Sequence, residues 1–277
     1  MIYKFNNLEY DLSSRTFVMG VLNITPDSFS DGGKYFDKDI QMQRIVVDAV
    51  RMEREGADFI DVGGESTRPG AQKVSADKEI LRVIPVISEI KKHINIPISI
   101  DTYKHEVAEE ALKVGAVIVN DISGFQFDDK IAEVTKKYNA SCILMHIKGT
   151  PKEMQKNPVY DNVIEEIKEY LGNSVSIAKE AGIEQIIVDP GIGFGKTFEH
   201  NIEIIKNLYK FKSLGYPVLL GLSKKRFINE IYESGTDERV EGTMAANTAG
   251  ILNGANIIRV HDVLENKRAA LTADALK

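Results

Sequence analysis

The chain contains little of what secreted, membrane-spanning or nucleic-acid-binding proteins depend on. Its single cysteine, Cys142, rules out an internal disulfide framework and a cysteine-rich metal site. The chain contains no run of about 18 apolar residues, which is the length needed to cross a bilayer. The first residues lack the charged and apolar regions of a signal peptide. No long basic run is present, and 35 Lys plus Arg against 41 Asp plus Glu give a net charge of −6, which argues against a nucleic-acid partner. We therefore expect a cytoplasmic protein that binds neither membrane nor nucleic acid.

Short apolar stretches typical of buried strands alternate with helical stretches along the chain. They cover residues 16–23, 57–63, 98–101, 117–120, 141–145, 186–189, 218–221 and 256–260. The 277 residues, 43% of them hydrophobic, are enough for one large domain and require no linker. This alternation predicts a single (β/α)8 TIM barrel of the α/β class over residues 1–277.

An open doubly wound sheet is the alternative fold. It would carry a glycine-rich phosphate loop after its first strand, and Gly20, Gly32 and Gly33 do not make that fingerprint. Weak alternation around Asn6 and Asn7 also predicts a small N-terminal β-hairpin that closes the bottom of the barrel.

Helices are expected between these strands. The first five cover residues 39–55, 75–93, 104–114, 128–138 and 159–181, and a sixth begins near Glu199. Ser75 is a candidate N-cap. Residues 234–242 separate two helical stretches between the last two strands, and a final helix closes the chain.

Polar side chains follow the predicted strands. They are Asn23, residues 65–70, Asp101, Asn120, Asp121, His146, Asp189, residues 223–226 and residues 259–262. One strand-end Asp or Asn alone could be a helix N-cap or a turn residue. Because the carboxyl ends of barrel strands meet at one mouth, a polar group at every end favours a functional site there.

These side chains are of two chemical kinds. Carboxylate and amide oxygens suited to a heterocycle rich in N–H donors come from Asp101, Asn120 and Asp189. Cationic donors suited to phosphate come from Arg68, Lys225, Arg259 and His261. The last two strands are the usual phosphate side of a barrel. The sequence therefore predicts a polar heterocyclic substrate that carries phosphate.

Two apparent motifs lack the residue pattern that their function requires. Residues 193–197 resemble the end of a P-loop, but Pro190 stands where that motif requires glycine. His93, His105, His146 and His200 show no zinc-ligand spacing.

Residues 21–33 and 61–70 resemble the two signature loops of the dihydropteroate synthase family. Further matches lie at residues 100–102, 119–121, 145–146, 189–196, 223–225 and 259–262. The resemblance covers nearly the whole chain from Phe17 onward. Lys224 departs from it, because the family more often has Arg there. Lysine keeps the charge but lacks the planar fork.

The resemblance implies a folate-pathway transferase and target of sulfonamides. Such an enzyme condenses 6-hydroxymethyl-7,8-dihydropterin pyrophosphate with 4-aminobenzoate, with Mg²⁺, to give 7,8-dihydropteroate and pyrophosphate. It also implies a homodimer.

The resemblance assigns the site residues in groups. The pterin would contact Asp101, Asn120, Ile122, Met145, Asp189, Lys225 and Arg259. Pyrophosphate would contact Asn23, Arg68, Arg259 and His261, and Asn23 would also hold Mg²⁺. The aminobenzoate pocket would comprise Thr67, Pro69, Phe194 and Ser223. The catalytic set would be Asp31 and Arg68 on two mobile loops with Asp101, Asp189 and Lys225.

The family mechanism agrees with the two kinds of side chain. Pyrophosphate leaves first, cations stabilise its charge, carboxylates stabilise the pterin cation, and the neutral amine then attacks.

The sequence leaves two alternative functions open. A methyltetrahydrofolate:corrinoid methyltransferase has a similar barrel and pterin pocket, but it does not need Asp31, Arg68 or a pyrophosphate site. The second alternative is a pterin-binding or scaffold protein with decayed catalytic loops. The intact Asn23, Asp31, Arg68 and Lys225 argue against that decay.

Overall fold

The computed structural model describes residues 1–5, 8–24, 38–68 and 70–277. Within these residues, eight parallel strands form one sheet in the order β8-β7-β6-β5-β4-β3-β10-β9. A parallel bridge between Val188 and Val218 joins β8 to β9 and closes the ring. The strands are β3 (Phe17–Asn23), β4 (Phe59–Gly63), β5 (Ile98–Asp101), β6 (Ile118–Asp121), β7 (Ser141–Met145), β8 (Ile186–Asp189), β9 (Leu219–Leu220) and β10 (Ile257–Val260). The predicted TIM barrel is confirmed.

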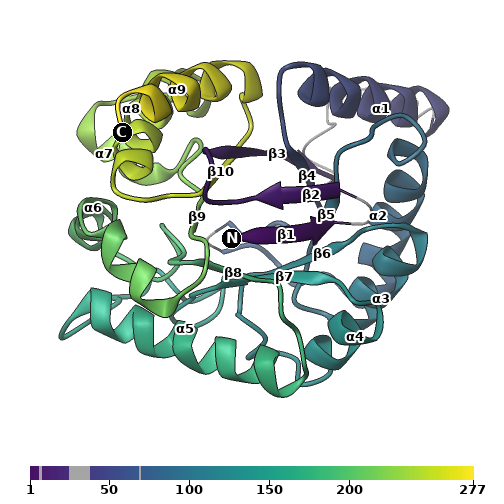
Figure 1. The fold of residues 1–277 in the computed structure, drawn as a ribbon, viewed down its shortest axis with the longest axis horizontal. Coiled ribbons are helices and arrows are strands. Elements are labelled where there is room, and N and C mark those ends of the chain that lie inside the picture. The colour runs from purple at the N-terminus through teal and green to yellow at the C-terminus, as the bar shows by residue number, and fades with distance from the viewer. Residues whose placement is uncertain (6–7, 25–37, 69) are drawn as a thin grey trace.

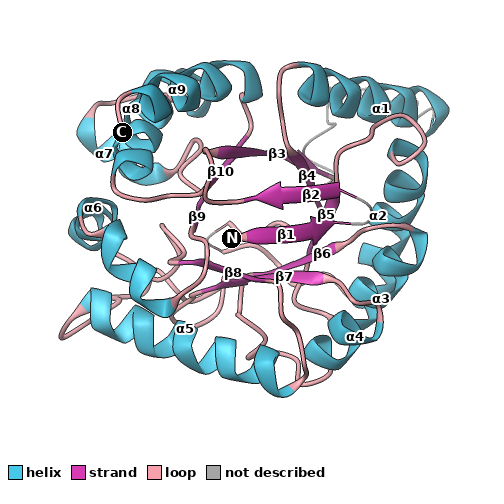
Figure 2. Cartoon of the chain, viewed as in Figure 1, coloured by secondary structure: helices cyan, strands magenta, loops and turns pink. Residues whose placement is uncertain are grey.

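Helices surround this barrel (Figure 1). They are α1 (Lys38–Arg54), α2 (Ala76–Ile90), α3 (His105–Val114), α4 (Ile131–Lys137), α5 (Val163–Glu180), α6 (Phe198–Lys206), α7 (Arg226–Ile231), α8 (Val240–Leu252) and α9 (Val263–Ala275), with the 3-10 helices η2 (Leu208–Leu214) and η3 (Thr236–Glu238). Figure 2 shows this alternation of strand and helix. Among the described residues, no helix combines the length and the apolar character needed to cross a membrane.

Two helices begin later than the sequence predicts. Helix α5 begins at Val163 instead of residue 159, because the Asn162 side chain accepts a hydrogen bond from the Glu165 backbone N–H and caps the helix there. Helix α4 begins at Ile131 instead of residue 128, and the Asp128 carboxylate accepts from the Lys130 backbone N–H at 3.0 Å in the turn that precedes the helix. Ser75 stands at the N-cap of α2, but its side chain makes no capping hydrogen bond.

The N-terminal hairpin closes the amino-terminal end of the barrel, as predicted. Strands β1 (Ile2–Phe5) and β2 (Leu8–Asp11) pair antiparallel and lie across the barrel centre in Figure 1. The Phe5 ring packs edge-on against Phe59 at 5.2 Å between centroids, and the Tyr3 hydroxyl donates to the Ile186 carbonyl at 2.6 Å. Asn6 and Asn7 lie outside the described residues. Because this end is plugged by aromatic side chains, the site must lie at the carboxyl ends of the strands.

The opposite end of the barrel is polar. Strand register pairs Gly63 with Asp101, and Asp101 with Asn120, at the carboxyl ends of β4, β5 and β6. A Cβ atom added to Gly63 would lie 3.5 Å from Asp101 Oδ2 and 3.7 Å from Asn23 Oδ1. The Asn23 amide and the Asp101 carboxylate therefore both lie beside Gly63.

Candidate active site

A chain of hydrogen bonds joins four polar side chains at the mouth. Arg259 of β10 donates from Nε to Asp61 Oδ2 at 2.6 Å and from Nη2 to Asp101 Oδ2 at 2.8 Å. The Asn120 amide of β6 donates from Nδ2 to the same Asp61 oxygen at 3.0 Å. Three predicted pterin residues, Asp101, Asn120 and Arg259, are therefore brought together.

Burial raises the pKa values of two carboxylates at this mouth. Burial raises the pKa of Asp101, and the Arg259 guanidinium opposes that rise. Burial likewise raises the pKa of Asp189 to about 6, although the backbone N–H of Gly191 donates to Asp189 Oδ1 at 2.7 Å and favours the ionised form. Both groups are placed to receive a positive charge or an N–H donor from a ligand.

Lys225 lies beside this acidic group and an aromatic ring. Its Nζ is 4.2 Å from the centroid of the Phe194 ring. Burial and the nearby Arg259 lower the pKa of Lys225 to about 8, against the opposing effect of Asp189 and Asp101. The predicted convergence of Asp101, Asp189 and Lys225 on one mouth is thus observed.

Apolar side chains form one wall of the mouth. Ile122, Met145 and Phe194 are buried in a cluster with Ile147 and Met154. Such a wall suits the faces of a flat ring whose edges are bound by the polar groups.

His261 and Ser223 hold each other at the end of β10. The Ser223 hydroxyl lies 3.1 Å from His261 N and 2.9 Å from His261 Nδ1. Burial and the neighbouring cations lower the pKa of His261 to about 3. This lowered pKa favours the neutral imidazole, whereas the sequence predicts a cation at this position. A neutral imidazole still offers one N–H to a phosphate oxygen.

Arg68 reaches the same side from the loop after β4. Its side chain is exposed, but its charge is close enough to lower the pKa of His261. The start of the loop is fixed, because the buried Lys104 pairs with both Glu65 and Glu79. Thr67, on the same loop, is half-buried. Asp31 and Pro69 lie outside the described residues.

Comparison with known proteins places this site in a family. A family described as pterin binding enzyme matches residues 19–261. A protein of Clostridium beijerinckii named dihydropteroate synthase is 49% identical over 276 residues, which cover 99% of this chain and 98% of that protein. The chain belongs to the dihydropteroate synthase family.

Other members of the dihydropteroate synthase family support this placement. The Bacillus subtilis protein of that name is 48% identical over 95% of this chain and 89% of its own length. A Clostridium difficile dihydropteroate synthase crystallised with pteroic acid matches with a TM-score of 0.89 and 46% identity, covering 96% of this chain and 98% of that one. A Yersinia pestis dihydropteroate synthase in a sulfonamide complex matches with a TM-score of 0.92 and 37% identity, covering 100% of this chain and 99% of that one. The family resemblance seen in the sequence is confirmed.

The structure of this dihydropteroate synthase family member also reveals polar residues that sequence reasoning missed. Asp61 is fully buried within β4 and binds both Arg259 and Asn120. Lys196 is also buried, with its Nζ 2.8 Å from His146 Nδ1 and donating to the Phe194 carbonyl at 2.9 Å. Burial lowers the pKa of Lys196 well below its usual range. Lys196, in the segment that resembles a P-loop, therefore holds the backbone of Phe194.

Asp121 has a local structural role. Its carboxylate accepts hydrogen bonds from the Ser123 backbone N–H and hydroxyl, each at 2.7 Å, and from the Phe125 backbone N–H at 3.0 Å. These bonds shape the loop after β6.

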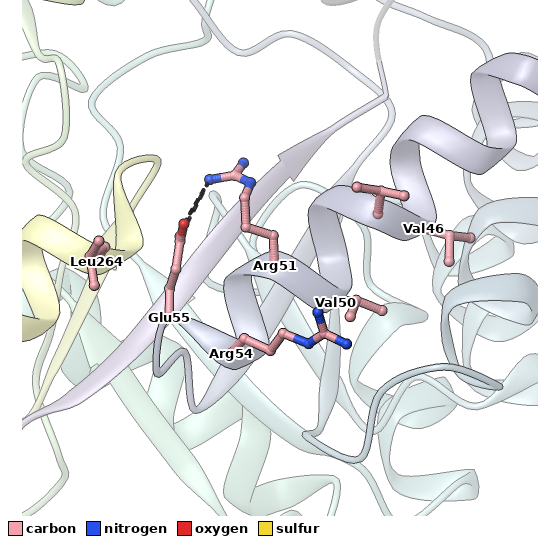
Figure 3. A pocket seen from close by; sticks show the side chains of 7 residues that line it. Val46, Val50, Arg51, Arg54, Glu55 and Leu264 are labelled. Atoms are coloured by element: carbon pink, nitrogen blue, oxygen red, sulfur yellow. Dashed lines mark hydrogen bonds and ion pairs between the residues drawn. The ribbon is translucent and has the colours of Figure 1, made fainter.

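Surface grooves on the outer helices lie away from the mouth. One, of about 440 Å³, is lined by residues of α1 such as Val46, Val50 and Arg51 and by Leu264 of α9 (Figure 3). Another, of about 350 Å³, lies along α6. Neither contains a residue assigned by the family resemblance.

The oxygen of the Asn23 side chain could bind Mg²⁺ only if phosphate oxygens of a ligand complete the coordination. Asn23 Oδ1 is an amide oxygen, and Mg²⁺ is commonly bound by one or two protein oxygens together with phosphates and water. Elsewhere in the described ranges, ligand atoms of His105, Glu106 and Asp128 lie within 4.8 Å of one another. Asp128 already caps α3 by accepting from the His105 backbone N–H at 2.9 Å.

Proposed function

We propose that this chain is a dihydropteroate synthase. It condenses 6-hydroxymethyl-7,8-dihydropterin pyrophosphate with 4-aminobenzoate to give 7,8-dihydropteroate and pyrophosphate. One observation carries the proposal: Arg259 is bonded to Asp61 and Asp101 at the same mouth where Asp189, Lys225 and His261 converge. Acceptors for a nitrogen-rich ring and donors for a diphosphate are therefore adjacent.

The pterin binds on the acidic side of the mouth. The carboxylates of Asp101 and Asp189 and the amide oxygen of Asn120 accept from ring N–H groups, and Lys225 donates to ring acceptors. Ile122 and Met145, which are buried in one apolar cluster, are the residues proposed to contact the ring faces. A ring lacking these N–H groups would leave buried carboxylates unpaired, which gives the pocket its specificity.

The diphosphate binds on the cationic side. Arg259 and Arg68 supply charge, while the neutral His261 and the amide of Asn23 supply hydrogen bonds. Asn23 is also the residue proposed to hold Mg²⁺. When bound, the ion would supply further positive charge to the leaving diphosphate.

The reaction proceeds by departure of the diphosphate before attack of the amine. The bond between the pterin methylene carbon and the diphosphate oxygen breaks, and both bonding electrons leave with the diphosphate. The buried carboxylates of Asp101 and Asp189 stabilise the resulting cation. The neutral amine of 4-aminobenzoate then forms the C–N bond and loses one proton, which the released diphosphate or water accepts. No nucleophilic side chain is needed.

The aminobenzoate lies between Phe194 and the loop after β4. Thr67, Pro69, Phe194 and Ser223 are the proposed lining. A Xanthomonas albilineans dihydropteroate synthase crystallised with 4-aminobenzoic acid matches this chain with a TM-score of 0.89 and 37% identity, covering 97% of this chain and 95% of that one. The same pocket is the proposed site of sulfonamide competition, as the sulfonamide complex of the Yersinia pestis relative supports.

A cytoplasmic homodimer is the proposed state of the chain. The family resemblance carries the dimer proposal, and Leu252 of α8 and Leu271 of α9 are among the exposed apolar side chains. Light scattering on purified protein would test the dimer, and a monomer at micromolar concentration would contradict it.

A product assay tests the function. The purified chain is mixed with the pterin pyrophosphate, Mg²⁺ and 4-aminobenzoate, and mass spectrometry measures 7,8-dihydropteroate. We expect product and equimolar pyrophosphate. Pterin binding without pyrophosphate release would instead favour the methyltransferase, and release of neither product would favour a binding protein.

A further inference from the structure

A buried carboxylate with no catalytic role in the proposed reaction lies beneath the mouth. Asp61 is fully buried in β4, two residues before the Gly63 that ends the strand. Its Oδ2 accepts from Arg259 Nε at 2.6 Å and from Asn120 Nδ2 at 3.0 Å. One oxygen atom thus links side chains from β4, β6 and β10.

Stability alone does not explain a carboxylate at this position. A buried charge is costly unless all of its oxygens are satisfied, and an apolar residue of similar size is often as stable or more so. Among the described residues, Asp61 Oδ1 has no hydrogen-bond partner. The position is better explained by the two groups that Oδ2 holds.

The bond to Asn120 determines which end of the amide faces the mouth. Because Nδ2 donates to Asp61, Oδ1 is the end left to accept from a ligand. A rotated amide would present N–H donors to the N–H donors of a pterin. Arg259 donates from Nε to Asp61 and from Nη2 to Asp101, and these two hydrogen bonds fix the plane of its guanidinium.

We infer that Asp61 is a positioning residue for pterin recognition, which presents Asn120 Oδ1 and the Arg259 plane to the ring. The inference rests on the proposed function, since it requires a pterin at this mouth. Asp61 itself does not touch the substrate.

Asp61→Asn is the first test, because it removes the charge and keeps the shape. Ser99→Ala is its matched control: Ser99 pairs with Asp61 in register on β5, is fully buried, and has no side-chain hydrogen bond within the described part of the chain. Titration calorimetry with 6-hydroxymethyl-7,8-dihydropterin measures Kd. We expect Asp61→Asn to weaken binding about tenfold and Ser99→Ala to stay within about twofold of the unmodified chain.

A double-mutant cycle separates positioning from general destabilisation. If Asp61 acts through Asn120, Asp61→Asn should cost much less affinity in an Asn120→Ala background than alone. Equal costs in the two backgrounds, or unmodified affinity in Asp61→Asn, would overturn the inference. Thermal unfolding of every variant verifies that the binding measurements report folded protein.

A further pair of variants leaves Asp61 intact and so does not depend on the folding of Asp61→Asn. Asn120→Asp keeps an oxygen for the pterin but sets a second carboxylate against Asp61, so it should bind pterin more weakly than Asn120→Ala. Tighter binding by Asn120→Asp than by Asn120→Ala would refute the contact. If the unmodified chain itself binds no pterin, the proposed function fails and the inference fails with it; if it binds and the variants disagree, only the inference fails.

Discussion

Replacing Asp101 with alanine should move affinity and stability in different directions. The Asp101 carboxylate faces the mouth, and its Oδ2 accepts from Arg259 Nη2 at 2.8 Å. In the proposed complex it also accepts from a ring N–H. A hydrogen bond to a charged group contributes about 1.5 to 3 kcal/mol, so its loss should weaken pterin binding about 10- to 150-fold.

The thermal stability of Asp101→Ala should not fall along with its pterin affinity. Burial raises the pKa of Asp101, so the folded state disfavours its ionised form, and that cost is present at any pH above the raised pKa. After removal, Arg259 still pairs with Asp61 at 2.6 Å, so no unpaired cation is left buried. We expect the Tm of Asp101→Ala to equal or exceed that of the unmodified chain in alkaline buffer.

Asp58→Asn is the matched control for this experiment. Asp58 is also a largely buried aspartate, but it lies at the amino-terminal end of the barrel, where it pairs with Arg15 at 2.6 Å and accepts from the Val18 backbone N–H at 2.8 Å. The control should lower Tm and leave pterin Kd unchanged. Calorimetric titration and thermal unfolding give both quantities. Unmodified pterin affinity in Asp101→Ala would refute the reasoning, and so would a loss of Tm as large as that of Asp58→Asn.

Three further predictions follow from the same geometry. Arg68→Ala should lower kcat while leaving pterin Kd near normal, because the exposed Arg68 acts on the departing diphosphate; a large loss of pterin affinity would contradict that role. Affinity for the pterin pyrophosphate should fall as pH rises through about 8, because Lys225 loses its charge there, and Lys225→Met should bind weakly with no such pH dependence. Phe5→Ala should lower the free energy of unfolding by about 3 to 5 kcal/mol in urea titrations without changing pterin Kd, since Phe5 plugs the far end of the barrel; a changed Kd would link the two ends.

The sequence was sufficient to predict the architecture and most of the mouth, for a physical reason. Strands buried on both faces read as short apolar runs, so the polar residue that ends each run is conspicuous. Asp101, Asn120 and Asp189 were found in this way, and the parallel register brings Asp101 beside Asn120. The hairpin was predicted from weak alternation around the turn-prone residues Asn6 and Asn7.

Residues inside a strand or in a misleading motif were not predicted. Asp61 lies within β4 instead of at its end, and its partner Arg259 is 198 residues away in the sequence. Lys196 is in a segment that resembles a P-loop, and its partner His146 is 50 residues earlier. These contacts form when the fold brings distant segments of the chain together, so no local sequence pattern predicts them. A charged residue at an inward-facing position of a buried strand is the signal that could have found Asp61.

The arrangement of pterin and phosphate sites at one mouth is tested most directly by a crystal structure of the chain soaked with 6-hydroxymethyl-7,8-dihydropterin and pyrophosphate. We expect the ring edge to lie against Asp101, Asn120 and Asp189, and the phosphates to lie beside Arg259 and His261. Phosphates bound on the carboxylate side, or a pterin bound away from the barrel mouth, would contradict it.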